Sequence, residues 1–441
     1  MRVSNTLYAL AVASVIATPA AIPILAQDIA ARVARLPDGV AHLQFASRPG
    51  VCGDGRDAIG FRKAFFAENI QSIGNWNAPS CVTGPVRVAL TVAGGKVTRI
   101  RTSVGGTWPR TGERVTDLGA VSPVEASSYF FGLIPRIERA ENKSRNLLPA
   151  VLADAGDVTP RLTALARDDA RTQDTRRQAI MWLGLLGDAK VVPTLIAFAR
   201  SGSPRTGDVV DEHDDGPGSE GLASTAMAAL TYVPDGAGVP ALIDVARTGS
   251  PGARQSAVFW LGQSGDPRAF ATLHSIIENS GEDERVRSHA IFALSHGGDV
   301  PQSEFAYLRG MFPRLQSNKL KEQVLMGMRE DERNGSAWLI AKARDPQESL
   351  STRKTALFWA GQDEVTPTRD LVAFYRNASE ASLKEHAIFV LSQRDDKDSI
   401  DELMRIAQSD SDKRMRAKAM FWLGQKDDPR VTKFIGDRIA K

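Results

Sequence analysis

A stretch beginning at Ser203, "SPRTGDVVDEHDDGPGSEG", holds the densest cluster of side chains that could bind a metal ion. Its acidic residues are Asp208, Asp211, Glu212, Asp214 and Asp215, with His213 among them. Oxygen ligands at this density suit calcium, but the EF-hand pattern fails because Leu222 stands where a bidentate Glu is needed. We therefore predict no metal or other cofactor, and keep Asp208, Asp211, Asp214 and Asp215 as weak candidates. The other interpretation is a solvated insertion near 203–221 that contacts a partner.

Six histidines are present, and none completes a catalytic or metal-binding pattern. His289 and His386 occupy the same slot of a repeated unit, three units apart. His289 and His296 are separated by roughly 10 Å if the segment is helical, which is too far to share one ion. The sequence contains no H-E-x-x-H and no G-x-S-x-G motif. We predict no catalytic residue and expect the histidines to be structural or exposed.

The two cysteines, Cys52 and Cys81, both lie in the N-terminal part of the chain. We predict that they form a disulfide, closing a loop of about 30 residues worth roughly 3 kcal/mol in the chain-entropy model. The alternative is a pair of free or metal-binding thiols, but two cysteines without a nearby histidine pair make a poor zinc site.

Residues 1–26 resemble a secretory signal peptide. Arg2 is followed by the apolar run "LYALAVASVI", and "PILAQD" offers a cleavage site after Ala26. The alternative is an uncleaved membrane anchor. No other stretch has the roughly 18 apolar residues that a spanning helix requires. We expect a periplasmic or secreted protein without a membrane span after cleavage.

The composition is that of a soluble globular protein, with 42% hydrophobic and 24% charged residues among 441. The formal net charge of +3 is small for this length and argues against nucleic-acid binding.

The sequence "AVFWLGQSGDPR" from Ala257 returns as "AMFWLGQKDDPR" from Ala419, and equivalent units occur throughout the second part of the chain. The equivalents of Ala257, here called anchors, are Leu148, Ala179, Ala226, Ala257, Ala290, Val324, Ala356, Ala387 and Ala419. They recur every 31 to 34 residues, apart from one step of 47 that contains the acidic insertion. Such a period is the signature of a repeat array.

Each unit predicts a helix, a tight turn and a second helix. The residue four positions after the anchor is usually Leu and shares the anchor's helical face. Nine positions after the anchor stands an Asp that we expect to cap the second helix. These residues are Asp157, Asp188, Asp235, Asp266, Asp299, Asp396 and Asp428. Three positions before the anchor is a basic residue: Arg145, Arg176, Arg254, Arg287, Lys321, Arg353, Lys384 or Arg416.

Units of the form R-x-x-A-x-x-W-L-G-x-x-x-D resemble HEAT-like repeats, in particular the short type of phycobilisome-lyase-like proteins. The resemblance covers residues 122–441 and implies an α-solenoid of about nine helix-turn-helix repeats. It also implies that the Arg and Asp columns form a structural ladder between layers. Unit six departs from the pattern, with Gly327 at the Trp position and Arg333 where Asp is expected.

Residues 27–121 follow other rules and predict a small α+β domain. "VRVALTV" from Val86 alternates as a strand does, "AGGK" is a turn, and "VTRIRTSVGG" is a partner strand. The segment from Asp57 to Gly74 is expected to be a helix.

The Trp and Phe residues within the repeats have helical spacing, and we interpret them as core. The combined reading is a non-enzymatic exported scaffold that binds a protein partner through the α-solenoid. Two alternatives stay open: a lyase-like or enzyme-accessory protein acting on a bound tetrapyrrole, and a calcium-responsive envelope protein. The last helix is not followed by a polar capping repeat, which leaves a homodimer through that end open.

Overall fold

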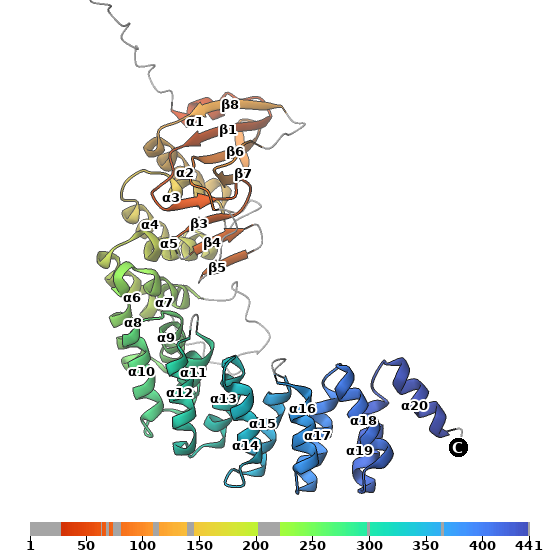
Figure 1. Ribbon diagram of the computed structural model, residues 1–441. Helices are drawn as coiled ribbons and strands as arrows, with labels where there is room; N and C mark the ends of the chain where they lie inside the picture. Colours follow the sequence, from red (N-terminus) through yellow and green to blue (C-terminus); the bar gives the residue numbers. More distant parts are fainter. Residues whose placement is uncertain are drawn as a thin grey trace, which may run out of the picture.

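The computed structural model of the protein describes residues 28–62, 64–67, 70–73, 81–108, 114–138, 145–201, 221–297, 300–362 and 366–439 (Figure 1). A small sheet-containing region comes first, and stacked helix pairs follow it. None of the helices in these residues is both long and apolar enough to cross a membrane.

The first sheet has four strands in the order β7-β6-β1-β8. They are β1 (Gly39–Phe45), β6 (Val86–Ala93), β7 (Lys96–Val104) and β8 (Val115–Ala120). β6 and β7 form the predicted hairpin, with Val86 opposite Val104. The turn between them uses Gly94 and Gly95, both with positive φ, which glycine adopts without steric cost. β1 pairs antiparallel with β6 and parallel with β8.

The second sheet is an antiparallel meander in chain order: β2 (Val51–Gly53), β3 (Ile59–Phe61), β4 (Ala64–Ala67) and β5 (Ile70–Ile73). The predicted helix from Asp57 to Gly74 is therefore wrong. The segment is rich in Ile and Phe, which favour strands, and Gly60 weakens a helix. Each strand also finds an antiparallel neighbour only two to five residues away, so pairing needs no long loop.

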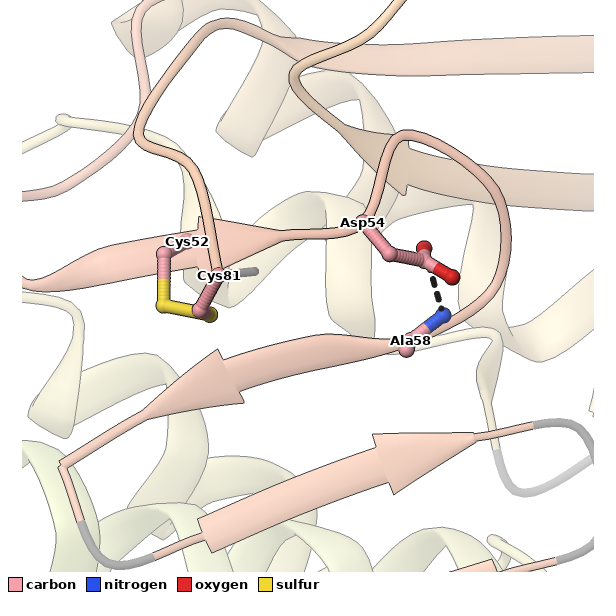
Figure 2. Close-up of a disulfide and its surroundings, with 4 residues drawn as sticks. All are labelled: Cys52, Asp54, Ala58 and Cys81. Carbon is pink, nitrogen blue, oxygen red and sulfur yellow. Dashed lines mark hydrogen bonds between the residues drawn. A yellow bond between two sulfur atoms is a disulfide. The ribbon is translucent and has the colours of Figure 1, made fainter. Parts of the chain in front are cut away.

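A disulfide joins Cys52 of β2 to Cys81, as predicted, with the two Cα atoms 5.2 Å apart (Figure 2). Next to it, Gly53 and Val82 exchange two backbone hydrogen bonds of 3.0 and 2.9 Å. The loop from β2 to β3 is closed by Asp54, whose carboxylate accepts a 3.1 Å hydrogen bond from the Ala58 N–H (Figure 2). The disulfide thus fastens the returning chain to the first strand of the meander.

One face of the first sheet is covered by α1 (Ile29–Ala34), α2 (Pro123–Ile137) and the start of the helical stack. Strand residues on that face, such as Leu43 and Leu90, are fully buried together with Ile29, Phe130 and Ile134. These side chains belong to one apolar core that continues into the helical stack, and their burial stabilises both parts.

The rest of the described chain forms nine helix pairs. They are α3 (Leu148–Leu152) with α4 (Thr159–Arg167), α5 (Gln173–Leu186) with α6 (Val192–Ser201), α7 (Leu222–Tyr232) with α8 (Val239–Thr248), α9 (Pro251–Gln263) with α10 (Pro267–Glu278), α11 (Glu284–His296) with α12 (Gln302–Met311), α13 (Asn318–Gly327) with α14 (Gly335–Arg344), α15 (Leu350–Gln362) with α16 (Thr368–Asn377), α17 (Ala381–Ser392) with α18 (Lys397–Ser409), and α19 (Lys413–Leu423) with α20 (Pro429–Ile439). The pairs stack in chain order into an open arc that leads away from the sheets (Figure 1).

All nine anchors are buried, each at most 1% exposed. These anchors let the first helices of neighbouring pairs approach closely. A glycine five positions after the anchor allows the same close approach further along the helix. At Gly262 of α9, an added Cβ would lie only 2.5 Å from the Ala293 carbonyl oxygen of α11. The repeated "WLG" therefore encodes contact between layers.

The sheet region and the stack are joined directly. The Arg48 N–H donates to the Leu152 carbonyl over 2.7 Å, and the Asp154 N–H donates to the Ala46 carbonyl over 3.1 Å. The Phe61 and Trp182 rings lie 5.9 Å apart between centroids. The sheet region thus covers the apolar end of the stack, which would otherwise face water.

Candidate partner-binding face

The acidic insertion lies outside the described residues, which stop at Ser201 and resume at Gly221. Metal binding by Asp208, Asp211, Asp214 and Asp215 therefore stays a prediction. Within the residues that the structure does describe, no group of three or more His, Cys, Asp or Glu side chains could hold a metal ion.

Two histidines of the repeats have clear structural partners. The Nε2 atom of His386 lies 2.9 Å from the Lys354 carbonyl oxygen in the preceding pair, and His296 stacks on Phe292 with ring centroids 4.3 Å apart. Burial lowers the pKa of His289, His296 and His386. A lowered pKa keeps these rings neutral near pH 7, which suits a packing role.

The sequence did not single out a cluster between the second helices of two layers. His274 of α10 stacks on Tyr307 of α12, and its Nε2 atom lies 2.5 Å from a carboxylate oxygen of Glu304. The Tyr307 hydroxyl donates to the His274 carbonyl over 3.3 Å. Every group here has a partner inside the cluster, so it fastens α10 to α12.

The Asp column caps helices as predicted at most described positions. The carboxylates accept hydrogen bonds from first-turn N–H groups of the following helical segment at Asp157, Asp188, Asp266, Asp396 and Asp428. Asp235 is an exception, because its φ of 58° places it in the left-handed region. Asp299 lies outside the described residues.

Unit six keeps its cap in a different position. Arg333 takes the usual place of the Asp, but Asp331, two residues earlier, accepts hydrogen bonds from the N–H groups of Arg333 and Asn334. Asp331 is 1% exposed and also forms an ion pair with Arg309.

The basic column has a different role from the predicted ladder with the Asp column. Arg176, Arg254, Arg287 and Arg353 each donate through Nε, over 2.9 to 3.1 Å, to a last-turn carbonyl of the preceding helix. Those carbonyls lack helical partners and carry the negative end of the helix dipole. A guanidinium group therefore supplies the missing hydrogen bond and a compensating positive charge.

Ties between layers come from the same basic residues, but their partners are glutamates. Arg254 pairs with Glu282, which precedes the first helix of the next layer. Lys321 pairs with Glu348 at 2.7 Å, and Arg353 contacts Glu380 at 2.5 Å, in the same relation. The implied Arg–Asp ladder is thus an Arg/Lys–Glu ladder, because the Asp side chains are used as helix caps.

A row of aromatic side chains lies two positions after the anchors. Its members are Phe259 on α9, Phe292 on α11, Phe358 on α15, Phe389 on α17 and Phe421 on α19, with Met326 in this place on α13. Two residues advance about 200° around a helix, so these side chains point away from the buried anchors. Phe421 is 58% exposed and the others are half-buried. The interpretation of the phenylalanines as core is therefore wrong for Phe421, whereas Phe389 packs against the core from a half-buried position.

The tryptophans next to this row differ in how deeply they are buried. Trp182, in the second helix pair, is buried at 2% exposure, as predicted. Trp260, Trp359 and Trp422 are half-buried, packing on the core with one side. We call the five phenylalanines together with these three tryptophans the aromatic stripe.

The aromatic stripe is continuous across the last layers. The Phe358 and Phe389 rings are stacked with centroids 6.3 Å apart, and Phe389 lies 5.3 Å from Trp422. The Arg329 guanidinium carbon lies 5.5 Å from the centre of the Trp359 ring, so a cation lies at the edge of the stripe. The stripe combines flat apolar surface with polar neighbours, the composition of protein-binding surfaces.

Comparison with known families identifies repeats in part of the stack. Residues 224–328 match the family model of HEAT repeats, and residues 175–201 match the PBS lyase HEAT-like repeat. The helix pairs within these two ranges are HEAT-like repeats. The matched residues span α5 to α13, and the remaining pairs of the stack continue the same arrangement.

Two solved structures resemble this chain distantly. One is the complex of CpcE and CpcF of phycocyanin lyase from Nostoc sp. PCC7120, at 18% identity and a TM-score of 0.28, covering 60% of this chain and 94% of the other. Another is human deoxyhypusine hydroxylase in complex with glycerol, at 16% identity and a TM-score of 0.25, covering 56% and 89%. Comparison with curated proteins finds no match. Likenesses this distant say nothing about activity.

Proposed function

We propose that the protein is an exported, non-enzymatic scaffold that binds a protein partner through its HEAT-like α-solenoid. The aromatic stripe carries this proposal. Apolar rings held at part exposure on successive rigid helices offer a surface that loses little conformational entropy on binding. Aromatic residues also dominate the binding energy of protein interfaces.

The dimensions of the stripe suit a protein ligand. It crosses the layers from α9 to α19, five steps along the stack. With neighbouring helices roughly 8–10 Å apart, it extends over about 40–50 Å. A compact interface of about 800 Å² per partner is roughly 30 Å across, so the stripe is long enough to span one.

Export is proposed from the signal-peptide pattern of residues 1–26, which lie outside the described residues. The Cys52–Cys81 disulfide supports it, because disulfides persist in oxidising compartments such as the periplasm. The test is mass spectrometry of the protein from fractionated cells. A mature N-terminus at Gln27 in the periplasmic or secreted fraction is expected, and an intact Met1 in the cytoplasm would contradict export.

The non-enzymatic part of the proposal is supported by the partners of the polar groups. His386 and His274 are engaged in hydrogen bonds between layers. The purified protein should therefore stay colourless, and it should leave the absorption spectrum of an added bilin unchanged. A shifted bilin spectrum would favour the tetrapyrrole alternative.

The partner is sought by affinity capture from the cell-envelope fraction, with the chain from Gln27 as bait. One variant bait carries Phe421→Gln and a matched control carries Leu350→Gln, an exposed apolar residue at the start of α15, about 12 Å along that helix from Phe358. A third bait lacks Ser203–Gly221. The proposal predicts a protein that the wild-type and Leu350→Gln baits enrich and the Phe421→Gln bait loses. Equal enrichment by all baits would refute the stripe as the contact, and loss only with the third bait would place it at the acidic insertion.

A further inference from the structure

The second face of the first sheet is more polar than its buried face, and most of its described residues are half-buried. Side chains alternate along β7, so Ile100, Thr102 and Val104 are buried while Arg99 and Arg101 lie on the opposite side. On β6, Arg87 shares that side, because it stands opposite Ser103 while Arg101 stands opposite Ala89. Three guanidinium groups therefore belong to one face of two adjacent strands.

These three arginines lack carboxylate partners. Among the described residues, no Asp or Glu lies within ion-pairing distance of Arg87, Arg99 or Arg101. The Nε atoms of Arg87 and Arg99 are buried donors without an acceptor. Because these Nε atoms are buried, a ligand on the surface can reach only the terminal nitrogens of the guanidinium groups.

An aromatic residue lies next to these arginines. Trp108 stacks on His42 of β1 with ring centroids 3.8 Å apart, and the Arg87 guanidinium lies 5.9 Å from the Trp108 ring. Arg87 also donates to the carbonyl groups of Gly105 and Gly106, which holds the chain that carries Trp108. We call Arg87, Arg99, Arg101, Trp108 and His42 the basic face.

A carboxylate of the described residues lies at the far side of this surface. Asp117 of β8 stands opposite His42, at the strand farthest from β7. Its side chain accepts a 2.8 Å hydrogen bond from the Gly119 N–H. Positive charge is thus concentrated on the β6–β7 side, where Arg101 is exposed.

We propose that the basic face binds an extended acidic segment of another protein, with carboxylates on alternate residues. Arg99 and Arg101 are two residues apart on one strand, so their Cα atoms are separated by roughly 6.6–6.8 Å. Alternate side chains of an extended peptide have the same spacing and point to the same side. Guanidinium groups bind carboxylates through paired hydrogen bonds, and Arg101 is exposed and available to such a ligand. β7 is also the outer strand of the sheet, and its end at Val104 accepts a hydrogen bond from the Gly55 N–H.

This inference does not rest on the aromatic stripe, because the basic face belongs to the sheet region. The probe is a fluorescein-labelled peptide in which aspartate alternates with threonine. A second peptide of the same composition has its aspartates in one block. The full chain from Gln27 is titrated into each, and fluorescence anisotropy reports binding.

The variant Arg99→Gln with Arg101→Gln is compared with Arg285→Gln with Arg369→Gln, which removes the same charge from exposed positions of the stack. We expect the first pair to weaken binding of the alternating peptide at least about tenfold and the second to change it less than about twofold. Hydrogen exchange should slow in Lys96–Val104 when the alternating peptide binds.

Several outcomes would overturn the proposal. Equal affinity for the two peptides would mean a diffuse charge effect without register, and equal loss in both variant pairs would mean the same. Absence of peptide binding, together with binding to phosphatidylglycerol vesicles, would show that the ligand class is wrong. Thermal melting of each variant verifies that the sheet region remains folded.

Discussion

Replacement of Gly262 by alanine tests directly how the layers are held together. In α9 this glycine faces α11, and an added Cβ would lie 2.5 Å from the Ala293 carbonyl oxygen and 2.7 Å from the Ala293 Cβ atom. Both neighbours belong to a packed helix and cannot turn aside as a flexible side chain does. The two helices must therefore separate by several tenths of an ångström along the seam.

The expected size follows from two opposing effects. Alanine favours the helical state over glycine by about 1 kcal/mol. Overpacking of a well-packed contact costs about 1–3 kcal/mol, and a clash with backbone belongs at the upper end. The net loss for Gly262→Ala is about 1–2 kcal/mol. Gly252 lies in the same helix with no atom within 4 Å of an added Cβ, so Gly252→Ala should be neutral or stabilise by up to ~0.5 kcal/mol.

Hydrogen exchange read by mass spectrometry suits a repeat array, because layers open locally and a single unfolding midpoint hides this. Gly262→Ala should speed exchange of peptides from α9 and α11 roughly five- to thirtyfold, the factor that corresponds to the expected loss. Gly252→Ala should not speed exchange. Wild-type protection in Gly262→Ala, or equal loss in the two variants, would refute the reasoning.

Three further predictions concern other parts of the chain. Replacing Cys52 and Cys81 by serine should destabilise the sheet region by roughly 3 kcal/mol, visible as a lower melting temperature that a reductant no longer changes. Burial alone would raise the pKa of Asp396, but hydrogen bonds led by those from Ser399 lower it to about 2. The stabilisation is therefore complete above about pH 4 and is lost as the pH falls toward 2. At pH 7, Asp396→Asn should be less stable than the wild type by about 1 kcal/mol, a figure that allows for the partial exposure of Asp396. Near pH 2 the variant and the wild type should be equally stable. Arg287→Met should speed exchange at the end of α10, because it removes two hydrogen bonds of 3.0 and 2.9 Å to one carbonyl; unchanged exchange there would contradict this role.

The repeats made most of the fold predictable, because each layer presents the same contacts to the next. Small anchors at a fixed period, a leucine four positions later and an Asp in the turn define helix pairs without knowledge of distant contacts. The hairpin of β6 and β7 was equally local, since alternating residues flank two glycines. In all these cases the deciding interactions lie within about one repeat length of sequence.

The features that the sequence analysis predicted wrongly or missed depend on contacts with other parts of the chain. The strands β3 to β5 contain apolar residues that also fit a helix, and their pairing decides between the two. The phenylalanines of the aromatic stripe look like core in composition, but their angle from the anchor turns them outward. The basic face requires the register of β6 against β7, which brings Arg87 beside Arg101.

The central claim is that the aromatic stripe binds a protein partner, and one dissociation constant tests it most directly. The captured partner is titrated against the wild-type chain, the Phe389→Gln/Phe421→Gln double variant and the Leu350→Gln control, each verified by circular dichroism to be folded. The account predicts that the double variant binds at least about thirtyfold more weakly, as expected for loss of about 2 kcal/mol at an aromatic hot spot, while the control binds like the wild type. Equal affinity of all three proteins would contradict it and move the search for the contact to another surface.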